Sequence, residues 1–435
     1  MTDTTTPPQG QSGKLGWYPY LVVLILGLVY TFSYLDRQIV AILAEPIKND
    51  LNLTDTQVGM LSGLMFALFY TAFGIPVAWL ADRKNRVRIV ALACFLWSVF
   101  SGLCGLAQNF THLVIARIGV GVGEAGGSSP SMSIIADYFP PHKRGGAISL
   151  FSLGVPLGAT IGVAFGAWVA GEYGWRTAFI AVAIPGVLLS LLLLLLVREP
   201  KRGRYDPPAE VKAEPASMKE CIETYKKTPT LSLLLLSAGT YSFVFNAFGA
   251  WAPALLMRAK GATLEDISVY YSVVFGLAMA IGMFASGFLA DRFALRRVSA
   301  YAIFPAVALA IGVPFFVASV MADNWQLALG LLAVPMLMNM MFVAPGFAIV
   351  QNVAPANQRA TASAILMFVN NLVGMGLGPL FVGALSQHFS KTMESGAALQ
   401  QAMLWITPFY IPAIIALVLV GKALEKRQAA LAAAA

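Results

Sequence analysis

The chain consists largely of long apolar segments separated by short polar connections. Twelve such segments can be counted, at residues 17–45, 55–80, 87–107, 112–137, 146–170, 176–197, 229–256, 266–290, 297–320, 326–350, 359–387 and 403–422. Most are long enough for an α-helix to cross the hydrocarbon core, which takes about 20 residues. They are too uniformly apolar for the alternating strands of a membrane barrel. The pattern therefore predicts an all-α membrane protein with twelve transmembrane helices.

Composition supports a membrane location. Hydrophobic residues make up 58% of the 435 residues and charged residues only 11%, whereas soluble proteins carry about 25% charged residues. The first apolar run is too long for the core of a signal peptide, and no small-residue cleavage site follows it, so we expect it to remain as a span. The formal net charge of +8 indicates contact with anionic membrane lipids and not with nucleic acid, because the charges are sorted by membrane side.

The distribution of lysine and arginine predicts the orientation. If the N-terminus is cytoplasmic, 22 of the 29 basic residues lie in cytoplasmic segments and five in outside loops, and the other two, Arg37 and Arg117, lie within spans. Basic loops are retained on the cytoplasmic side of a membrane. We therefore expect both termini in the cytoplasm, and a location in the inner or plasma membrane.

The twelve spans divide into two similar sets of six. A charged, proline-rich connection at 199–228 separates the N-terminal half, 16–198, from the C-terminal half, 229–428, and a short amphipathic helix is expected near its end. The flanking segments 1–15 and 429–435 are expected to be a disordered N-terminus and a tail. The sequence Leu-Ala-Asp-Arg follows span two, ending at Asp82-Arg83, and recurs after span eight, ending at Asp291-Arg292. Such a repeat indicates a duplicated transporter.

These features resemble the major facilitator superfamily. The turn after span two is similar to the family motif G-x-x-x-D-R-x-G-R-R, with Ala78 and Asn85 in place of its two glycines. We expect Asp82 to lie near a helix N-terminus of the other half, where a carboxylate is favoured. We also expect Arg83 and Arg86 to pair with Asp137. The expected cytoplasmic gate comprises Asp82, Arg83, Arg86, Asp137, Arg144, Asp291 and Arg292.

Four charged residues lie inside the apolar spans: Asp36 and Arg37 in span one, Arg117 and Glu124 in span four. A charge at bilayer depth is costly and is functional by default. Two structural alternatives remain: a static lattice of buried ion pairs, or Asp36 and Arg37 reaching the interface. Because adjacent helical residues point about 100° apart, one residue of that pair can face a cavity while the other reaches span four.

The interpretation of these charges is proton coupling. Burial favours the neutral form of the Glu124 carboxyl group, whereas a nearby Arg117 favours its charged form. A change in their separation would load and unload a proton. An anionic substrate would compete for Arg37 or Arg117 and so couple its movement to the proton. We assign Glu124 and Asp36 to proton coupling, and Arg37 and Arg117 to binding the substrate head group or pairing with charge.

Glycine patterns indicate close packing. Glycine recurs every fourth residue from Gly154 to Gly166 in span five, and span eleven carries three glycines followed by Pro379. Such stripes let membrane helices approach closely. The run from Gly121 to Gly126 matches GxGxxG but neither follows a strand nor opens a helix, which excludes a dinucleotide site. Its glycines are expected to let span four bend or pack tightly around Glu124.

Two branches of the superfamily share these stretches. The sequences Tyr-Leu-Asp-Arg ending at Arg37, the run from Arg117 to Glu124, and the run from Asp137 to Arg144 resemble the spinster branch. That resemblance implies export of lysolipids or sphingoid phosphates. A similar pattern occurs in proton-coupled carriers of organic anions such as sugar acids. Both branches would use the four charges similarly.

The composition of the second half favours an amphiphilic substrate. Its spans place soft apolar and amide residues, but no charged residues, at cavity depth. The cavity candidates are Tyr241, Phe243, Asn246, Asn339, Met367, Asn370 and Asn371. A cavity charged on one wall and apolar on the other suits a lipid with an ionic head better than a sugar acid. The structural alternative is that these residues face lipid or pack between helices.

The sequence lacks the motifs that are typical of metalloproteins and enzymes. The three histidines fall at or near loops, and neither HExxH, CxxC nor GxSxG occurs. We therefore expect no metal, no cofactor and no catalytic site, and three free cysteines. The chain is predicted to act as a monomer that transports an amphiphilic anion together with protons as coupling ions.

Overall fold

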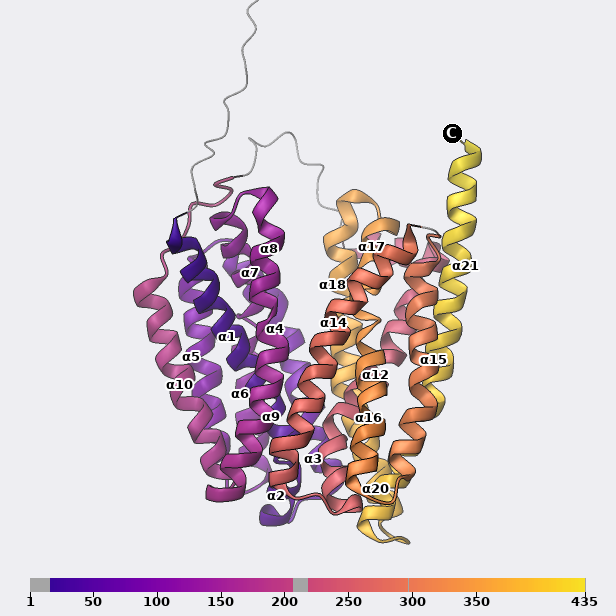
Figure 1. Cartoon of the computed structure of the whole chain (residues 1–435). Helices are drawn as coiled ribbons and strands as arrows, with labels where there is room; N and C mark the ends of the chain where they lie inside the picture. The colour runs from indigo at the N-terminus through magenta and orange to yellow at the C-terminus, as the bar shows by residue number, and fades with distance from the viewer. Residues whose placement is uncertain (1–15, 206–217, 296, 435) are drawn as a thin grey trace, which may run out of the picture.

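The computed structural model describes residues 16–205, 218–295 and 297–434, and within these ranges all regular structure is helical. The helices form two bundles that lie side by side (Figure 1). Both ends of the described chain, at α1 and α21, lie at the same end of the molecule, which we call the near end; the opposite end is the far end. The expected disordered segment 1–15 lies outside the described residues.

The N-terminal bundle contains, in order, α1 (Trp17–Ile42), α2 (Ala44–Leu51), α3 (Asp55–Gly59), the π-helical turn η1 (Met60–Leu64), α4 (Met65–Ala81), α5 (Arg86–Gly105), α6 (Phe110–Glu124), α7 (Ser128–Tyr138), α8 (Pro141–Ser152), α9 (Gly154–Tyr173) and α10 (Trp175–Leu196). The predicted first span therefore ends at Ile42, and the short helix α2 continues from it. Span two is built from α3, η1 and α4, and span five from α8 and α9.

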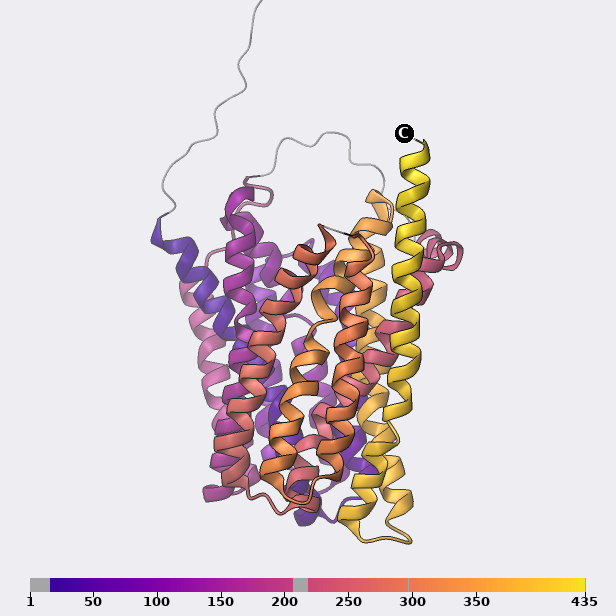
Figure 2. The ribbon, with the colours of Figure 1, turned by 45° about the vertical axis from the view of Figure 1, so that its right-hand side comes forward.

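The C-terminal bundle contains α12 (Pro229–Lys260), α13 (Leu264–Asp266), η2 (Ile267–Tyr271), α14 (Ser272–Ala294), α15 (Ala300–Met321), α16 (Trp325–Met340), α17 (Val343–Val353), η3 (Ala356–Gln358), α18 (Arg359–Val369), η4 (Asn370–Leu377), α19 (Gly378–Phe389), α20 (Ser395–Leu404), η5 (Thr407–Phe409) and α21 (Tyr410–Ala434). The tail expected at 429–435 is thus helical through Ala434. Figure 2 shows that α21 extends beyond its neighbours at the near end.

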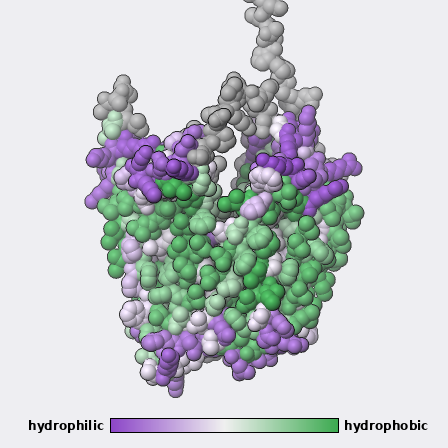
Figure 3. All heavy atoms as spheres, turned by 180° about the vertical axis from the view of Figure 1, so that it is seen from behind, coloured by the Kyte–Doolittle hydropathy of each residue, from purple (hydrophilic) through white to green (hydrophobic). Residues whose placement is uncertain are grey.

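Eleven helical segments of the described chain are long and apolar enough to cross a membrane. The remaining predicted span, 112–137, is divided into α6 and α7 by a non-helical turn at 125–127. Gly126 and Gly127 weaken the helix there, and Pro130 cannot donate a backbone hydrogen bond in the next turn. The all-α fold with twelve spans is confirmed, and span four is interrupted at its glycines. Figure 3 shows the apolar surface band between two polar ends.

The connection between the halves includes α11 (Met218–Lys227). Cys221 and Tyr225 on this helix are buried, and the Tyr225 hydroxyl donates to the Ala362 carbonyl oxygen at 2.9 Å. The apolar residues Met218 and Ile222 on the same helix are 48% and 43% exposed. The helix is therefore attached to the C-terminal bundle and leaves part of its apolar face open.

Glycines on α9 allow α1 to lie close to it. A Cβ atom at Gly158 would lie 2.2 Å from the Thr31 carbonyl oxygen, and one at Gly162 would lie 2.8 Å from the Leu35 carbonyl oxygen. Side chains at these positions would therefore push the two helices apart. This packing fixes the part of α1 that carries Asp36 and Arg37.

The two halves meet closely at the far end. A Cβ atom at Gly63 would lie 2.3 Å from the Met375 carbonyl oxygen, and one at Gly59 would lie 2.5 Å from that of Pro379. These contacts join η1 and α3 of one half to η4 and α19 of the other. At the near end the surface is hollowed between the bundles, as the notch in Figure 3 shows. The structure is therefore closed at the far end and open toward the near end.

Candidate functional site

The four charges within the spans form two ion pairs that join α1 to α6. Arg117 Nη1 lies 3.4 Å from Asp36 Oδ2, and Arg37 Nε lies 2.6 Å from Glu124 Oε2. The Arg117, Asp36 and Glu124 side chains are at most 3% exposed, whereas that of Arg37 is 16% exposed. Each arginine is paired with a carboxylate from the other helix, so the charges compensate one another at depth.

Neighbouring hydroxyl groups complete this arrangement. Ser33 Oγ donates to Glu124 Oε2 at 2.7 Å, and Ser101 Oγ on α5 donates to Asp36 Oδ1. The Arg37 guanidinium lies over the rings of Tyr34, Phe66 and Tyr70, with 4.8 to 5.0 Å between its carbon and the ring centroids. Aromatic faces attract a cation in this position. Arg37 therefore has both an anionic and an aromatic surrounding.

The expected proximity of Arg117 to Glu124 is replaced by this crossed pairing. Seven residues place both side chains on one face of a helix but about 10 Å apart along its axis. On α1, Asp36 is the nearer partner for Arg117, and Arg37 is the nearer partner for Glu124. Asp36 is directed into the bundle, where it meets α5 and α6, and Arg37 lines the central cavity. As expected, one residue of the pair lines the cavity, but both residues reach α6, where one was expected to do so.

Among the four charged side chains, two polar atoms have no hydrogen-bond partner within the described parts of the chain: Glu124 Oε1 and Arg117 Nε, both buried. Beside Glu124 lies a space of about 10 Å³ that Ser33, Ser128 and Ser131 help to line. This volume holds about one water molecule. An unpaired buried oxygen beside a polar space is a suitable position for a proton or for a water molecule that delivers one.

A central cavity of about 260 Å³ lies between the halves. The N-terminal half contributes Arg37, Gln38 and Arg117 to its wall, together with the rings of Tyr34 and Phe66. The C-terminal half contributes aromatic, amide and methionine side chains and, among its described residues, no charged residue. Four of the seven cavity candidates line it: Tyr241, Asn246, Asn370 and Asn371. The walls therefore differ in charge, as the sequence indicated.

The other three cavity candidates lie elsewhere. Phe243 packs against Phe381 and Phe409, because two residues after Tyr241 the side chain points to the other side of α12. Asn339 is buried inside the C-terminal bundle, where Nδ2 donates to the Pro335 carbonyl oxygen and the Tyr410 hydroxyl. Met367 is 49% exposed on α18. Residue type alone did not reveal how each helix is rotated.

Of the expected gate contacts, the structure brings Arg86 and Asp137 together. Arg86 Nη1 lies 2.5 Å from Asp137 Oδ2, and Arg86 Nε lies 2.7 Å from Glu199 Oε1. Glu199 also accepts from the Val87 backbone at 3.0 Å. These contacts tie α5, α7 and the segment after α10 together within one half. They stabilise the N-terminal bundle in this conformation.

The remaining gate residues also lie at the near end. Arg83 lies over the Trp79 ring at 4.0 Å, so the expected pair with Asp137 is not formed. Asp291 Oδ1 accepts from the Tyr301 hydroxyl at 2.9 Å, and Arg144 Nε donates to the carbonyl oxygens of Ala136 and Phe139. Asp82 and Arg292 are exposed. With the near end open, a contact of Asp82 with the other half stays a prediction.

A polar cluster at the far end was not anticipated from the sequence. Arg258 on α12 lies 2.8 Å from Asp55 Oδ2 and also contacts Glu45, which joins the C-terminal half to the N-terminal half. Asp55 further accepts from Lys48 at 2.7 Å and from Ser386 on α19 at 2.6 Å. We call Glu45, Lys48, Asp55, Arg258 and Ser386 the far-end cluster. The sequence signal was the capping box from Thr54 to Gln57, which places Asp55 at the first helical position.

Comparison with known proteins agrees with this architecture. The family model of the Major Facilitator Superfamily matches residues 26–375. A solved bacterial homolog of the human lysosomal transporter spinster, in an inward-facing and unoccupied conformation, is 30% identical with a TM-score of 0.85, covering 94% of this chain and 98% of that one.

Three similar proteins have names that describe different transport activities. An MFS-type efflux pump of Mycolicibacterium smegmatis is 32% identical over 88% of both chains. The hexuronate transporter of Bacillus subtilis is 27% identical over 83% of this chain and 86% of its own. The sphingosine-1-phosphate transporter SPNS2 of Danio rerio is 30% identical over 59% of this chain and 53% of its own. Similarity thus extends to carriers of both lipids and sugar acids.

Proposed function

Because the chain belongs to the major facilitator superfamily, we propose that it is a proton-coupled secondary transporter of an amphiphilic lipid, of the lysophospholipid or sphingoid-phosphate type. The observation that carries this proposal is the asymmetry of the central cavity. Arg37 and Arg117 on one wall suit an anionic head group. Tyr241, Phe245 and Met279 on the other wall suit an acyl chain.

Proton coupling is proposed to run through Glu124. Arg37 holds this carboxylate, and Arg37 also lines the cavity, so an anionic head group would compete with Glu124 for the same guanidinium. Once Arg37 is engaged by substrate, the buried carboxyl group is left without its cation, and uptake of a proton restores neutrality. Substrate and proton then favour each other's binding by linkage.

Alternating access would use the two ends of the molecule in turn. We infer that the near end is cytoplasmic, in the inner or plasma membrane, because the basic residues gather there. The far-end cluster would then hold the outside closed while the cavity is open to the cytoplasm. The proposed transporting unit is the monomer.

Replacing Arg258 by glutamine is expected to favour opening at the far end. The variant loses charge-assisted bonds to Glu45 and Asp55, and a shift of about 1.4 kcal/mol changes the open fraction about tenfold. The measurement is the labelling rate of a cysteine at Ser62, which lines the cavity, by an impermeant thiol reagent outside sealed vesicles. The three native cysteines are buried. Labelling no faster than in Lys391→Gln, a control at an exposed far-end position, would contradict this role.

The substrate class is tested by uptake into proteoliposomes that contain the purified chain. A fluorescent lysophospholipid should be taken up above the rate of empty vesicles, and unlabelled lysolipid should compete with it. An unlabelled hexonate at the same concentration should not compete. Uptake of hexonate but of no lysolipid would refute the lipid proposal.

The second candidate is proton-coupled symport of a small organic anion such as a sugar acid. The amide groups of Asn246, Asn370 and Asn371 on the cavity wall favour it, because amides can bond the hydroxyl groups of a sugar. The similarity to the hexuronate transporter is consistent with it. The same competition experiment separates the two candidates.

A further inference from the structure

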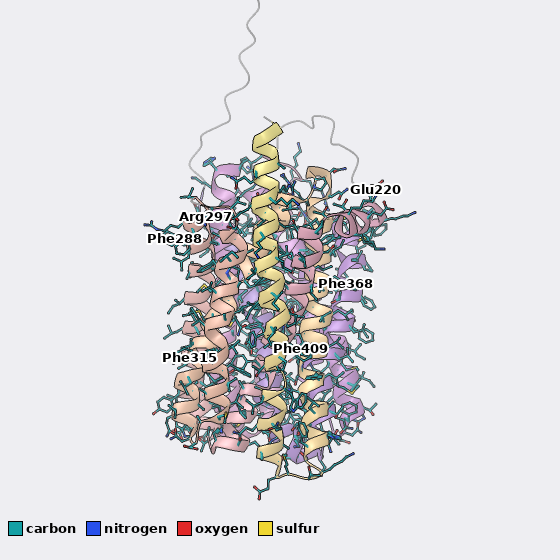
Figure 4. The ribbon with its side chains drawn as sticks, turned by 90° about the vertical axis from the view of Figure 1, so that its right-hand side faces the viewer. Glu220, Phe288, Arg297, Phe315, Phe368 and Phe409 are labelled. Carbon is teal, nitrogen blue, oxygen red and sulfur yellow. The ribbon has the colours of Figure 1, made fainter. Side chains whose placement is uncertain are left out.

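A second feature of the surface lies away from the central cavity, along the line where α15 meets α21. At the near end a groove of about 520 Å³ is lined by α14, α15 and α21, among them Phe293, Ile303 and Val307. Phe293 and Val307 are 43% and 52% exposed. Figure 4 shows Arg297 beside α21 at this end of the molecule. The groove therefore opens sideways, at the border of the apolar band.

The rim of the groove is basic. Arg297, in the turn before α15, and Lys422, on α21, line its near end and are both exposed. Glu425, the single acidic lining residue in the described ranges, accepts a hydrogen bond from Ser299 Oγ at 2.6 Å, which engages one of its carboxylate oxygens. Two cations above an apolar groove match a phosphate group that is attached to hydrocarbon.

The apolar part of the groove continues toward the far end. A further groove of about 530 Å³ is lined by Ala310, Val313 and Val317 on α15 and by Ile411 and Ile414 on α21. Residues 300, 303, 307, 310, 313 and 317 follow helical spacing, so they form one stripe on α15. From 300 to 317 the stripe extends about 25 Å along the helix axis. One leaflet of hydrocarbon is about 15 Å deep, so an acyl chain can lie within the stripe.

We propose that this groove binds an anionic phospholipid of the near-end leaflet, with the phosphate between Arg297 and Lys422 and an acyl chain along Ile303 and Val307. A phospholipid fits better than a free phosphate ion, because the ion would leave the apolar stripe uncovered. The site is separate from the central cavity and does not depend on what the protein transports.

The test is lipid retention by the purified full-length chain in native mass spectrometry, with equal amounts of phosphatidylglycerol and phosphatidylcholine of matched chains. The wild type should retain phosphatidylglycerol about tenfold more, a factor equivalent to about 1.4 kcal/mol. The double variant Arg297→Gln/Lys422→Gln should retain both lipids about equally. The control Lys84→Gln/Arg88→Gln removes the same charge from exposed residues at the near end of the other half and should keep the preference.

A second variant tests the apolar part of the groove without changing charge. Val307→Trp fills the groove and should lower retention of phosphatidylglycerol about as far as the double variant does. Unchanged preference in Arg297→Gln/Lys422→Gln would overturn the proposal, and so would equal loss in the control, which would indicate attraction by overall charge. Full retention by Val307→Trp would also contradict it.

Discussion

Replacing Glu124 by glutamine is expected to abolish the pH dependence of transport and to leave the fold intact. Glutamine has nearly the same shape and can still accept hydrogen bonds from Ser33 and Arg37, but it cannot take up a proton at this position. A single titrating group changes a rate by at most about tenfold per pH unit. The measurement is the initial rate of lysolipid uptake by proteoliposomes over a series of external pH values.

The matched control for this variant is Glu172→Gln, which removes an exposed carboxyl group at the end of α9. It should transport with the pH profile of the wild type. Unfolding temperatures of the three proteins should agree, which separates the loss of the proton site from damage to the fold. An unchanged pH profile in Glu124→Gln would refute the role of this residue as the proton site.

Replacing Arg117 by leucine is expected to destabilise the protein by about 3–5 kcal/mol, because it leaves a buried carboxylate without its cation. The side chains of Arg117 and Asp36 are 3% and 1% exposed. Adding Asp36→Asn to the same chain should recover a large part of the loss, since the uncompensated charge is then removed. The measurement is the free energy of unfolding of the purified protein in mixed micelles.

The control for this pair is Arg88→Leu, which removes an exposed arginine and should change stability by less than about 0.5 kcal/mol. If Arg117→Leu were no more harmful than this control, the buried pair would not be a source of stability. If the double variant were no more stable than Arg117→Leu, Asp36 would not be the partner that matters.

The charges at bilayer depth were identifiable from the sequence because such residues are rare and costly there. Their pairing was not, because it depends on the relative positions of α1 and α6 along their axes. Span four breaks after Glu124, and α1 lies close to α9 through Gly158 and Gly162. The resulting positions of α1 and α6 bring Asp36 to Arg117 and Arg37 to Glu124. A sequence pattern predicts which face of a helix a residue occupies, but not how far a neighbouring helix is shifted along the helix axis.

The far-end cluster illustrates a different limit. Asp55 and Arg258 lie in different halves, 203 positions apart, and each alone resembles an ordinary charge at a membrane border. The glycines of span eleven did indicate close packing there, and the structure places Gly374 and Gly376 in the π-helical segment η4. A π-helical segment leaves the helix locally irregular, a feature often found at functional sites. The polar groups that meet across that contact could be identified only from the three-dimensional structure.

The cavity wall of the C-terminal half was predicted in part. Tyr241 and Asn246 on α12, five residues apart, both line the cavity, and so do Asn370 and Asn371 at the start of η4. Phe243 and Asn339 were chosen for their chemistry, but each points into the bundle, where packing and hydrogen bonding engage it. For apolar helices with little amphipathic pattern, residue type predicts how deep a residue lies in the membrane better than it predicts which side of the helix faces the cavity.

The central claim is that lipid movement and proton movement are coupled in one molecule. The most direct measurement uses sealed proteoliposomes with a pH-sensitive dye inside and no initial pH gradient. Addition of lysophospholipid should change the internal pH with the wild type and produce no change with Glu124→Gln. Lysolipid uptake by the wild type without any proton movement would contradict the account.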